Sequence, residues 1–369
     1  MARIAINGLG RIGRAFLKLA LTRPELDVVA INELGDPEAL AYLLRFDSAY
    51  GRYRQAVSID PAHEEVALIV GDRRILFIRQ PDPIKLPWAA LKVDIVVEAT
   101  GAFEHYQQAR AHLAAGARRV VLTAPAKDDD GPDARTILVG INGDEFRDIS
   151  LSSNGSCTTN SVSPVIKALQ DTIGVRKAFL NTVHAYTATQ SLTDAPVKGR
   201  DFRRGRAAAA NIVPATTGAA TAVARAIPSL RNRFDGMAIR VPVTIGSLSA
   251  IVFLAERPTT VNEVNACLEQ AASQPRWKQI LAVTRDPIVS VDIVGDAHAA
   301  IVDLSLTKVV DGDLCCVYSW YDNEFGYANT LVEHVVQAAT LVARGYRSSG
   351  DTKVLSIPSS DGFPVAPLI

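Results

Sequence analysis

The chain has 369 residues, with 39 Lys plus Arg against 39 Asp plus Glu, so its formal net charge is zero. A neutral chain has no net field to attract nucleic acid or an anionic membrane, which argues against either as the main partner. Because 48% of the residues are hydrophobic and 21% charged, the chain can bury a sizeable core, and disorder is excluded for most of it. Its length favours two domains.

No stretch approaches the roughly 18 consecutive apolar residues of a membrane span. Met1 leads directly into a strand-like run and leaves no room for a signal peptide, so we expect a cytoplasmic protein. The spacing of the four cysteines fits neither a disulfide framework nor a zinc site: Cys157, Cys267, Cys315 and Cys316. We therefore expect no metal, and any special cysteine should be reactive rather than structural.

The first third of the chain alternates short apolar runs with helical patterns, which is typical of βαβ units and a parallel sheet. A helical pattern covers 14–21, and strands are predicted at 4–6, 28–31, 95–98, 120–122 and 137–139. Beyond residue 150 most of the pattern is strand-like, which predicts a mixed, largely antiparallel sheet. These strands are predicted at 178–185, 237–243, 248–254, 288–294, 299–306 and 314–318.

A last helical pattern covers 326–343, and 11 of the 25 residues from 345 to 369 are Gly, Ser or Pro. We therefore predict a first domain over 1–155, completed by a helix at about 324–344. A second domain over 156–323 follows, and the 345–369 tail is expected to be flexible.

Gly8, Gly10 and Gly13 form a G-x-G-x-x-G motif between a predicted strand and a predicted helix. Such a turn brings backbone close to a pyrophosphate at a helix N-terminus. Glu33 ends the next strand 20 residues after Gly13, as recognition of ribose hydroxyls requires. Because a carboxylate repels a 2′-phosphate, the pattern favours NAD over NADP. The alternatives are a plain turn and a solvated acid at a strand end.

Cys157 lies in the polar run 152–160, which precedes apolar residues at helical spacing. This pattern places the thiol in or beside the first turn of a helix, where the positive helix end should lower its pKa and make it a nucleophile. The alternative, an inert buried thiol, fits poorly with Ser, Asn and Thr neighbours.

A thiolate nucleophile needs a base, and His184 ends a strand-like run. A core histidine is the alternative. The other five histidines are expected on solvated faces: His63, His105, His112, His298 and His334. Arg240 lies within an apolar strand, which suits an anionic substrate or an internal ion pair. The basic segment 201–206 could bind phosphate or be a charged loop; its charge is local, so RNA binding is disfavoured.

Taken together, these motifs resemble phosphorylating glyceraldehyde-3-phosphate dehydrogenases. The resemblance covers nearly everything before the tail and is carried by the runs at 5–14, 156–160, 184–187, 217–220 and 320–327. It implies a Rossmann NAD-binding domain followed by an α+β catalytic domain. It also implies a homotetramer in which the loop holding Arg203 and Arg204 reaches a neighbouring cofactor site.

The resemblance implies that Cys157 attacks the aldehyde of glyceraldehyde 3-phosphate and that His184 takes the proton. Inorganic phosphate would then cleave a thioester to give 1,3-bisphosphoglycerate, a step of glycolysis and gluconeogenesis. The substrate phosphate would bind Thr187 and Arg240. The attacking phosphate would bind at Ser156, Thr158, Thr217 and Gly218. The residues implied around NAD, beyond the three glycines and Glu33, are Arg11, Ile12, Thr123 and Asn323.

Two departures keep alternatives open. Glu33 stands where the family commonly has Asp, although Leu34 and Pro196 match its NAD-using pattern. The runs at 32–34 and 86–88 resemble erythrose-4-phosphate dehydrogenase, whereas 184–187 and 216–218 keep the second phosphate site that this sister enzyme largely lacks. A catalytically silent binding protein of the same fold is the alternative from another class.

Overall fold

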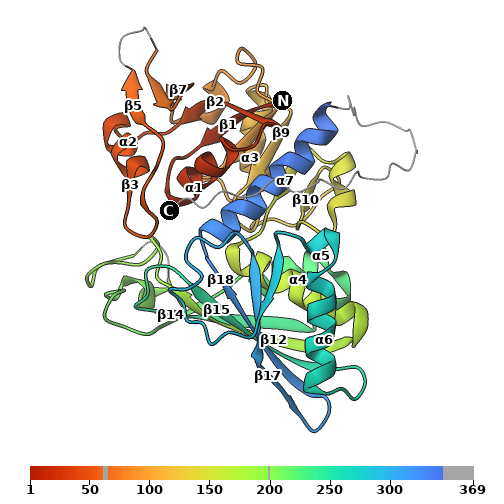
Figure 1. The fold of residues 1–369 in the computed structure, drawn as a ribbon. Coiled ribbons are helices and arrows are strands. Elements are labelled where there is room, and N and C mark those ends of the chain that lie inside the picture. Colours follow the sequence, from red (N-terminus) through yellow and green to blue (C-terminus); the bar gives the residue numbers. More distant parts are fainter. Residues whose placement is uncertain (61–64, 198–199, 344–369) are drawn as a thin grey trace. The chain divides into compact units, whose positions relative to one another are not determined.

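The computed structural model describes residues 1–60, 65–197 and 200–343. The chain divides into two compact units (Figure 1). Of the described residues, the first unit contains those of 1–137, 142–154 and 331–343, and the second contains those of 138–141 and 155–330. Each unit is built around its own sheet, so each is described separately.

The sheet of the first unit has nine strands in the order β10-β11-β9-β8-β1-β2-β7-β6-β5. The pairs from β10 to β7 are parallel, and β6 and β5 add an antiparallel edge. Strand β1 therefore lies between β2 and β8, which places three strand ends side by side. The strands are β1 Ala2–Asn7, β2 Leu26–Asn32, β5 Val57–Asp60, β6 Ala67–Val70, β7 Arg73–Ile78, β8 Ile95–Glu98, β9 Arg119–Leu122, β10 Ala134–Thr136 and β11 Leu151–Ser153.

The helices of this unit cover the sheet with apolar side chains. α1 begins at Arg11, directly behind the glycine turn, and buries Phe16 and Leu17 completely. The elements outside the sheet are α1 Arg11–Ala20, α2 Pro37–Arg45, the ribbon β3 Phe46–Asp47 with β4 Gly51–Arg52, η1 Pro83–Lys85, α3 Tyr106–Ala114 and η2 Gly143–Asp148. The predicted parallel sheet is thus confirmed.

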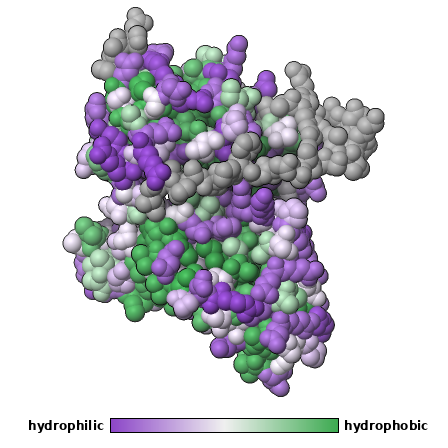
Figure 2. Space-filling view, viewed as in Figure 1, coloured by the Kyte–Doolittle hydropathy of each residue, from purple (hydrophilic) through white to green (hydrophobic). Residues whose placement is uncertain are grey.

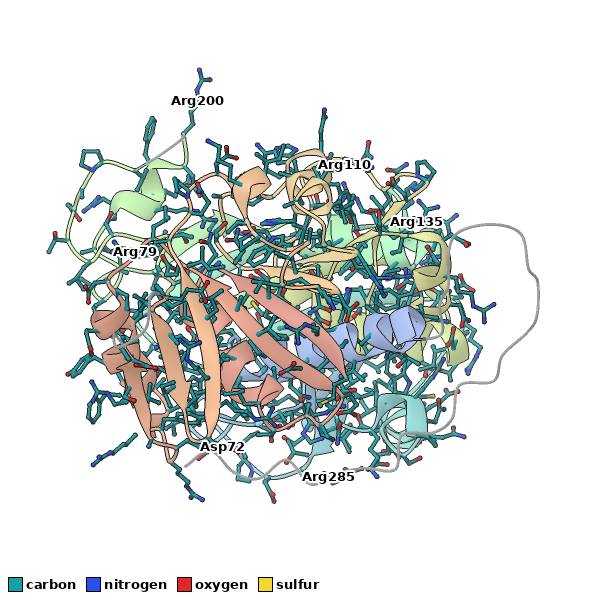
Figure 3. All side chains as sticks on the ribbon, turned by 90° about the horizontal axis from the view of Figure 1, so that it is seen from above. Asp72, Arg79, Arg110, Arg135, Arg200 and Arg285 are labelled. Atoms are coloured by element: carbon teal, nitrogen blue, oxygen red, sulfur yellow. The ribbon has the colours of Figure 1, made fainter. Side chains whose placement is uncertain are left out.

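Two strand predictions in this unit need correction. A strand is expected at 137–139, whereas the observed strand β10 covers Ala134–Thr136 and ends three residues earlier. The pattern analysis missed the hairpin of β6 and β7, whose turn contains Gly71 at φ +59 and the exposed Asp72 (Figure 3). β7 joins the sheet in parallel beside β2, and β6 then runs antiparallel to β7, an arrangement that βαβ periodicity does not indicate.

The second unit contains a seven-stranded sheet in the order β13-β14-β12-β15-β18-β17-β16. Only the pairs β12–β14 and β16–β17 are parallel, so the predicted mixed, largely antiparallel sheet is confirmed. The strands are β12 Val175–Ala185, β13 Val213–Thr216, β14 Phe234–Val241, β15 Ser247–Ala255, β16 Leu281–Thr284, β17 Ala300–Val310 and β18 Leu314–Tyr321.

One face of this sheet is buried under helices, and the other is apolar but half exposed. Strand β15 shows the difference: Ile251 and Phe253 enter the core, whereas Leu248 and Val252 on the alternate face are half-buried. The remaining elements are α4 Cys157–Thr172, η3 Phe202–Gly205, α5 Ala219–Ala226, η4 Pro228–Leu230, α6 Val261–Ala272 and η5 Pro275–Trp277.

The strand expected at 288–294 is wrong, because this segment forms turns in which Asp292 accepts a hydrogen bond from the Val289 backbone N–H at 2.7 Å. Helix α7, Phe325–Ala343, matches the last predicted helix. The 345–369 tail lies outside the described residues. Within the parts of the chain that the structure describes, no helix combines the length and apolarity needed to cross a bilayer.

Alanine substitutions at Gly13 and Gly10 form a matched pair that tests how closely the glycine turn is packed. A Cβ on Gly13 would overlap the backbone carbonyl of Gly8, whereas a Cβ on Gly10 would meet nothing within 4 Å. We expect G13A to lower the free energy of unfolding by about 2 to 3 kcal/mol, since backbone atoms must move apart. G10A should cost less than about 1 kcal/mol. Urea titration measures both, and equal losses would contradict this packing.

Candidate active site

The glycine turn of the first unit has the features that a dinucleotide phosphate requires. Gly8 has φ +98, and within the described residues no side-chain hydrogen bond caps the helix that begins after Gly10. The N-terminus of α1 carries the positive end of the helix dipole, and the open space at Gly10 lets an anion approach it. This turn fits the pyrophosphate of NAD.

Glu33 is not a freely solvated acid. Its Oε2 accepts the Leu9 backbone N–H at 2.8 Å, and its Oε1 accepts those of Leu34 and Gly35 at 2.8 and 3.1 Å. The longer side chain therefore reaches back to the glycine turn and braces it. Arg79, labelled in Figure 3, donates to the Leu34 carbonyl at 3.0 Å beside this acid. Sequence reasoning missed Arg79, because a lone arginine after a strand carries no motif.

The other residues expected around NAD in this unit lie near the strand ends. Arg11 and Ile12 open α1, and the Arg11 guanidinium pairs with Asp47 at 2.9 Å. Thr123 follows β9 and donates its backbone N–H to the Glu98 carbonyl at 3.1 Å. The structure therefore gathers these residues around the ends of the parallel strands, where such folds bind their ligands.

Cys157 is the first residue of α4, as the sequence predicts. Ser156 caps the helix in a reciprocal capping box with Thr159, which fixes the backbone around the thiol. The Cys157 Sγ lies 3.3 Å from Nε2 of His184, which ends β12 and is 2% exposed. The thiol and the imidazole are therefore in contact, as a nucleophile and its base would need to be.

The resting electrostatics differ from the expected thiolate. Burial raises the pKa of Cys157, and the opposing charge of Arg240 does not fully offset this effect. The prediction of a lowered thiol pKa is therefore wrong for the resting site. Burial first, and Arg240 second, lower the pKa of His184 to about 3. Both shifts disfavour the charged forms of the two side chains.

Arg240 lies beside His184 because the two residues are directly paired across β14 and β12. Its Nη1 donates to the Ala185 carbonyl at 3.0 Å and lies 2.6 Å from His184 Nδ1. Its buried Nε has no hydrogen-bond partner within 1–60, 65–197 and 200–343. Within the described residues, the hydrogen-bond contacts of the Arg240 guanidinium are to His184 and the Ala185 carbonyl, neither of which is an anion, so the charge suits a bound anion.

A second arginine strengthens the positive field around Arg240. Arg204 donates to the Thr189 hydroxyl at 3.0 Å, and Thr189 contacts the Thr187 hydroxyl at 2.9 Å. Arg204 is also close enough to lower the pKa values of His184 and Arg240. Thr189 was missed by sequence reasoning; the only available signal was a second hydroxyl two residues after Thr187.

The residues expected at the second phosphate site are only partly free to bind one. The Ser156 side chain caps α4, and the Thr158 hydroxyl lies 2.9 Å from that of the buried Tyr321. Thr217 and Gly218 precede α5, and Gly218 has open space around its Cα. The backbone N–H groups at these helix starts are therefore better placed than the Ser156 hydroxyl to receive an anion.

Asn323 follows β18 and is held by the loop before β15. Its Oδ1 accepts the Gly246 backbone N–H at 3.1 Å and the Ser247 hydroxyl at 3.2 Å. Ser247 Oγ in turn accepts the Ala185 backbone N–H at 3.2 Å. These bonds tie the Asn323 amide to the residue that follows His184.

Two histidines expected on solvated faces are fully buried: His112 and His334. The sequence pattern did not reveal their burial, because it depends on tertiary contacts. α3 packs against β9 and β11, and the His334 ring contacts Phe146 and Ser152. His63 lies outside the described residues. No group of three or more His, Cys, Asp or Glu side chains suited to a metal ion occurs where the structure describes the chain.

Comparisons with known proteins agree with this geometry. Residues 2–106 match the family model of the glyceraldehyde 3-phosphate dehydrogenase NAD binding domain, and residues 156–323 match that of the C-terminal domain. The chain is 42% identical to a glyceraldehyde-3-phosphate dehydrogenase of Clostridium pasteurianum over 336 residues, covering 90% of this chain and 97% of the relative. It is 45% identical to those of Mycobacterium leprae and Thermotoga maritima, covering 90% of this chain and 97% and 98% of the relatives.

Replacing Arg240 tests its influence on the thiol and the imidazole. Because Arg240 lowers both pKa values, R240Q should raise them both. We expect iodoacetamide to alkylate Cys157 about three- to tenfold more slowly at pH 7, since less thiolate is present. The His184 ring titration, followed by NMR, should move to higher pH. R233Q, at an exposed arginine of the same unit, is the control, and faster alkylation of R240Q would contradict the assignment.

Proposed function

This chain belongs to the glyceraldehyde-3-phosphate dehydrogenase family, and we propose that it catalyses the NAD-dependent, phosphorylating oxidation of D-glyceraldehyde 3-phosphate to 1,3-bisphosphoglycerate. The observation that carries this proposal is the contact of Cys157 Sγ with His184 Nε2 at 3.3 Å, beside the half-buried Arg240. A nucleophile, its base and an anion-binding cation are thereby held on three adjoining elements of the second unit.

The first chemical step joins the thiol to the aldehyde. As Cys157 Sγ bonds to the carbonyl carbon, its proton passes by way of His184 to the carbonyl oxygen, giving a hemithioacetal. Bound NAD supplies the hydride acceptor. His184 removes the hydroxyl proton as the hydride leaves, so the carbon is oxidised and a thioester to Cys157 remains.

The second step releases the product and restores the thiol. A phosphate oxygen attacks the thioester carbon, the carbon–sulfur bond breaks, and the acyl phosphate leaves. Cys157 departs with the bonding electrons and recovers a proton from His184. The open space at Gly218, before α5, supports an attacking phosphate here, whereas Thr187 and Arg240 suit the phosphate of the substrate.

Through Arg240, the phosphate of the substrate would raise the pKa of the base, His184. Its charge is the second cause of the low His184 pKa, after burial. An anion bound to Arg240 offsets that charge and makes His184 more basic. The Nε of Arg240 has no hydrogen-bond partner among the described residues, so it can receive an anion. The pKa of His184 should therefore rise when a phosphorylated substrate binds.

We also propose a homo-oligomer, a homotetramer by analogy with the family, in the cytoplasm. The outer face of the second unit's sheet supports an interface, since Phe179 and Val183 are 46% and 38% exposed and hydrophobic residues gather over this sheet (Figure 2). The four cysteines are free, which suits a reducing compartment.

The rate of NADH formation distinguishes the two candidate substrates, glyceraldehyde 3-phosphate and erythrose 4-phosphate. We expect rapid turnover of glyceraldehyde 3-phosphate that depends on inorganic phosphate, because phosphate resolves the thioester. Erythrose 4-phosphate is the comparison substrate, and preference for it without a need for phosphate would assign the chain to the sister activity instead.

Cys157 and Cys267 form a matched pair, since Cys267 is a partly exposed cysteine in α6 away from the reacting groups. C157S should lose at least about a thousandfold in kcat while binding NAD normally, because a hydroxyl is a far weaker nucleophile. C267S should keep nearly full activity. Substantial turnover by C157S would refute covalent catalysis, and an inactive parent enzyme would favour a silent binding protein.

The proposed interface can be tested with a buried charge. F179D places a carboxylate on the apolar sheet face, so we expect the oligomer to dissociate in sedimentation velocity experiments. Y42D adds the same charge at a 55% exposed residue of the first unit and should leave the assembly intact. An intact oligomer of F179D would exclude this face as an interface.

A further inference from the structure

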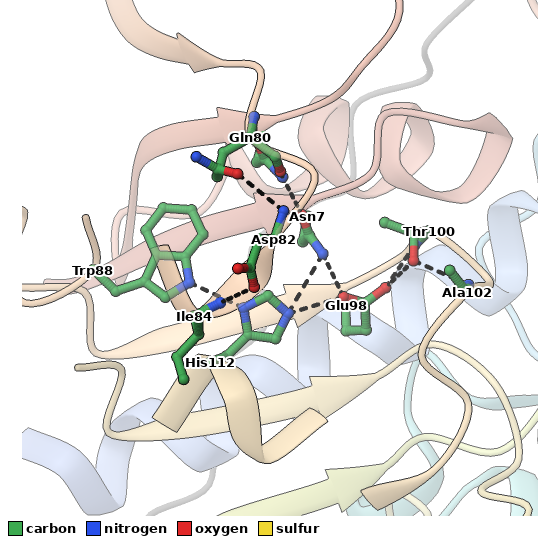
Figure 4. A network of polar contacts seen from close by, with 10 residues as sticks. Asn7, Gln80, Asp82, Ile84, Trp88, Glu98, Thr100, Ala102 and His112 are labelled. Carbon is green, nitrogen blue, oxygen red and sulfur yellow. Dashed lines mark hydrogen bonds and ion pairs between the residues drawn. The ribbon is translucent and has the colours of Figure 1, made fainter. Parts of the chain in front are cut away.

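A buried polar network occupies the strand ends of the first unit (Figure 4). It runs from Trp88 through His112 and Glu98 to Asn7 and Asn32, and all five side chains are at most 6% exposed. The chemistry proposed above uses none of these side chains. Buried charge of this kind is costly unless every group is satisfied, so its placement calls for a physical account.

Glu98 is the centre of the network and acts only as an acceptor. Its Oε2 accepts Nδ2–H of Asn7 at 2.5 Å and Nε2–H of His112 at 3.0 Å. Its Oε1 accepts the Thr100 backbone N–H at 2.9 Å and also the Thr100 hydroxyl. Four donors thus converge on one carboxylate, and no neutral side chain of this shape could accept them all.

Trp88 fixes the protonation state of His112. The indole Nε1 can only donate, and it lies 3.0 Å from His112 Nδ1, so Nδ1 must carry the lone pair. The ring proton is then on Nε2 and points at Glu98. The other groups near the ring are the Asn7 amide, 3.4 Å from Nε2, and the edge-on ring of Phe103. His112 is therefore held as a neutral donor to Glu98.

The Ala99–Thr100 peptide, which Glu98 holds, packs directly behind the glycine turn. A Cβ on Gly8 would lie 2.7 Å from the Ala99 carbonyl carbon and the Thr100 nitrogen, so the turn packs directly on this peptide. The Thr100 hydroxyl also accepts the Ala102 backbone N–H at 3.0 Å. The Gly8 N–H bonds to the Asn32 carbonyl at 2.8 Å, which ties the turn to the far end of the same network.

We propose that Glu98 and His112 are positioning residues for NAD: the carboxylate, oriented by the imidazole that Trp88 holds, fixes the Ala99–Thr100 peptide against which the Gly8–Gly10 turn is set. Neither side chain need touch the cofactor. The proposal rests on the NAD-binding assignment of this unit and not on which aldehyde is oxidised.

E98Q is the most direct variant, because it replaces one carboxylate oxygen of residue 98 with an amide N–H₂ group. This group is itself a donor and would face donors that Glu98 now accepts. We expect the Kd for NAD, measured by calorimetry without aldehyde, to rise about tenfold or more. The alkylation rate of Cys157 in the second unit should stay within about twofold, and kcat at saturating NAD should change far less than the KM for NAD. An unchanged Kd for NAD with a lower Tm would overturn the proposal, because the network would then be only structural.

Two histidine variants keep the test decisive if E98Q does not fold. H112Q retains an N–H donor toward Glu98 and should bind NAD more tightly than H112L, which has none. S152A is the matched control, since it removes the buried hydrogen bond between Ser152 and His334 at 2.8 Å in the same unit. It should lower Tm without altering the Kd for NAD. Equal weakening of NAD binding by S152A, or equal Kd values for H112Q and H112L, would refute a positioning role.

Discussion

A half-buried guanidinium beside a buried imidazole sets the electrostatics of the candidate site in the second unit. Arg240 and His184 are paired across two strands, so their separation is set by sheet register rather than by flexible side chains. The positive charge disfavours a protonated His184 and favours a thiolate at Cys157. Burial also disfavours the thiolate, so burial and Arg240 act against each other at Cys157 and in the same direction at His184.

In the first unit, two carboxylates fix the backbone next to the glycine turn. Glu33 and Glu98 each accept backbone N–H groups next to the glycine turn, one from β2 and one from β8. An ionised carboxylate can accept several donors at once, which makes it suited to hold irregular backbone in place. The turn that receives the dinucleotide is thus fixed from two sides before any ligand binds.

Several features could be predicted from the sequence because they depend on local pattern. Cys157 follows a capping sequence that can only begin a helix, and Gly8, Gly10 and Gly13 stand where a strand must turn into one. The antiparallel edge of β5 and β6 and the turns at 288–294 were not predicted, since apolar runs of that length are compatible with more than one structure.

The sequence by itself determined the two sheet types and the glycine turn, and it indicated Cys157 and His184 as the proposed nucleophile and base, because each is encoded in neighbouring residues. Only the tertiary structure decided the direction of the pKa shifts of Cys157 and His184, the burial of His112 and the convergence of Asn7, Glu98 and Trp88. These properties arise from residues far apart in the chain. Desolvation and hydrogen bonding act through space, so no local pattern records them.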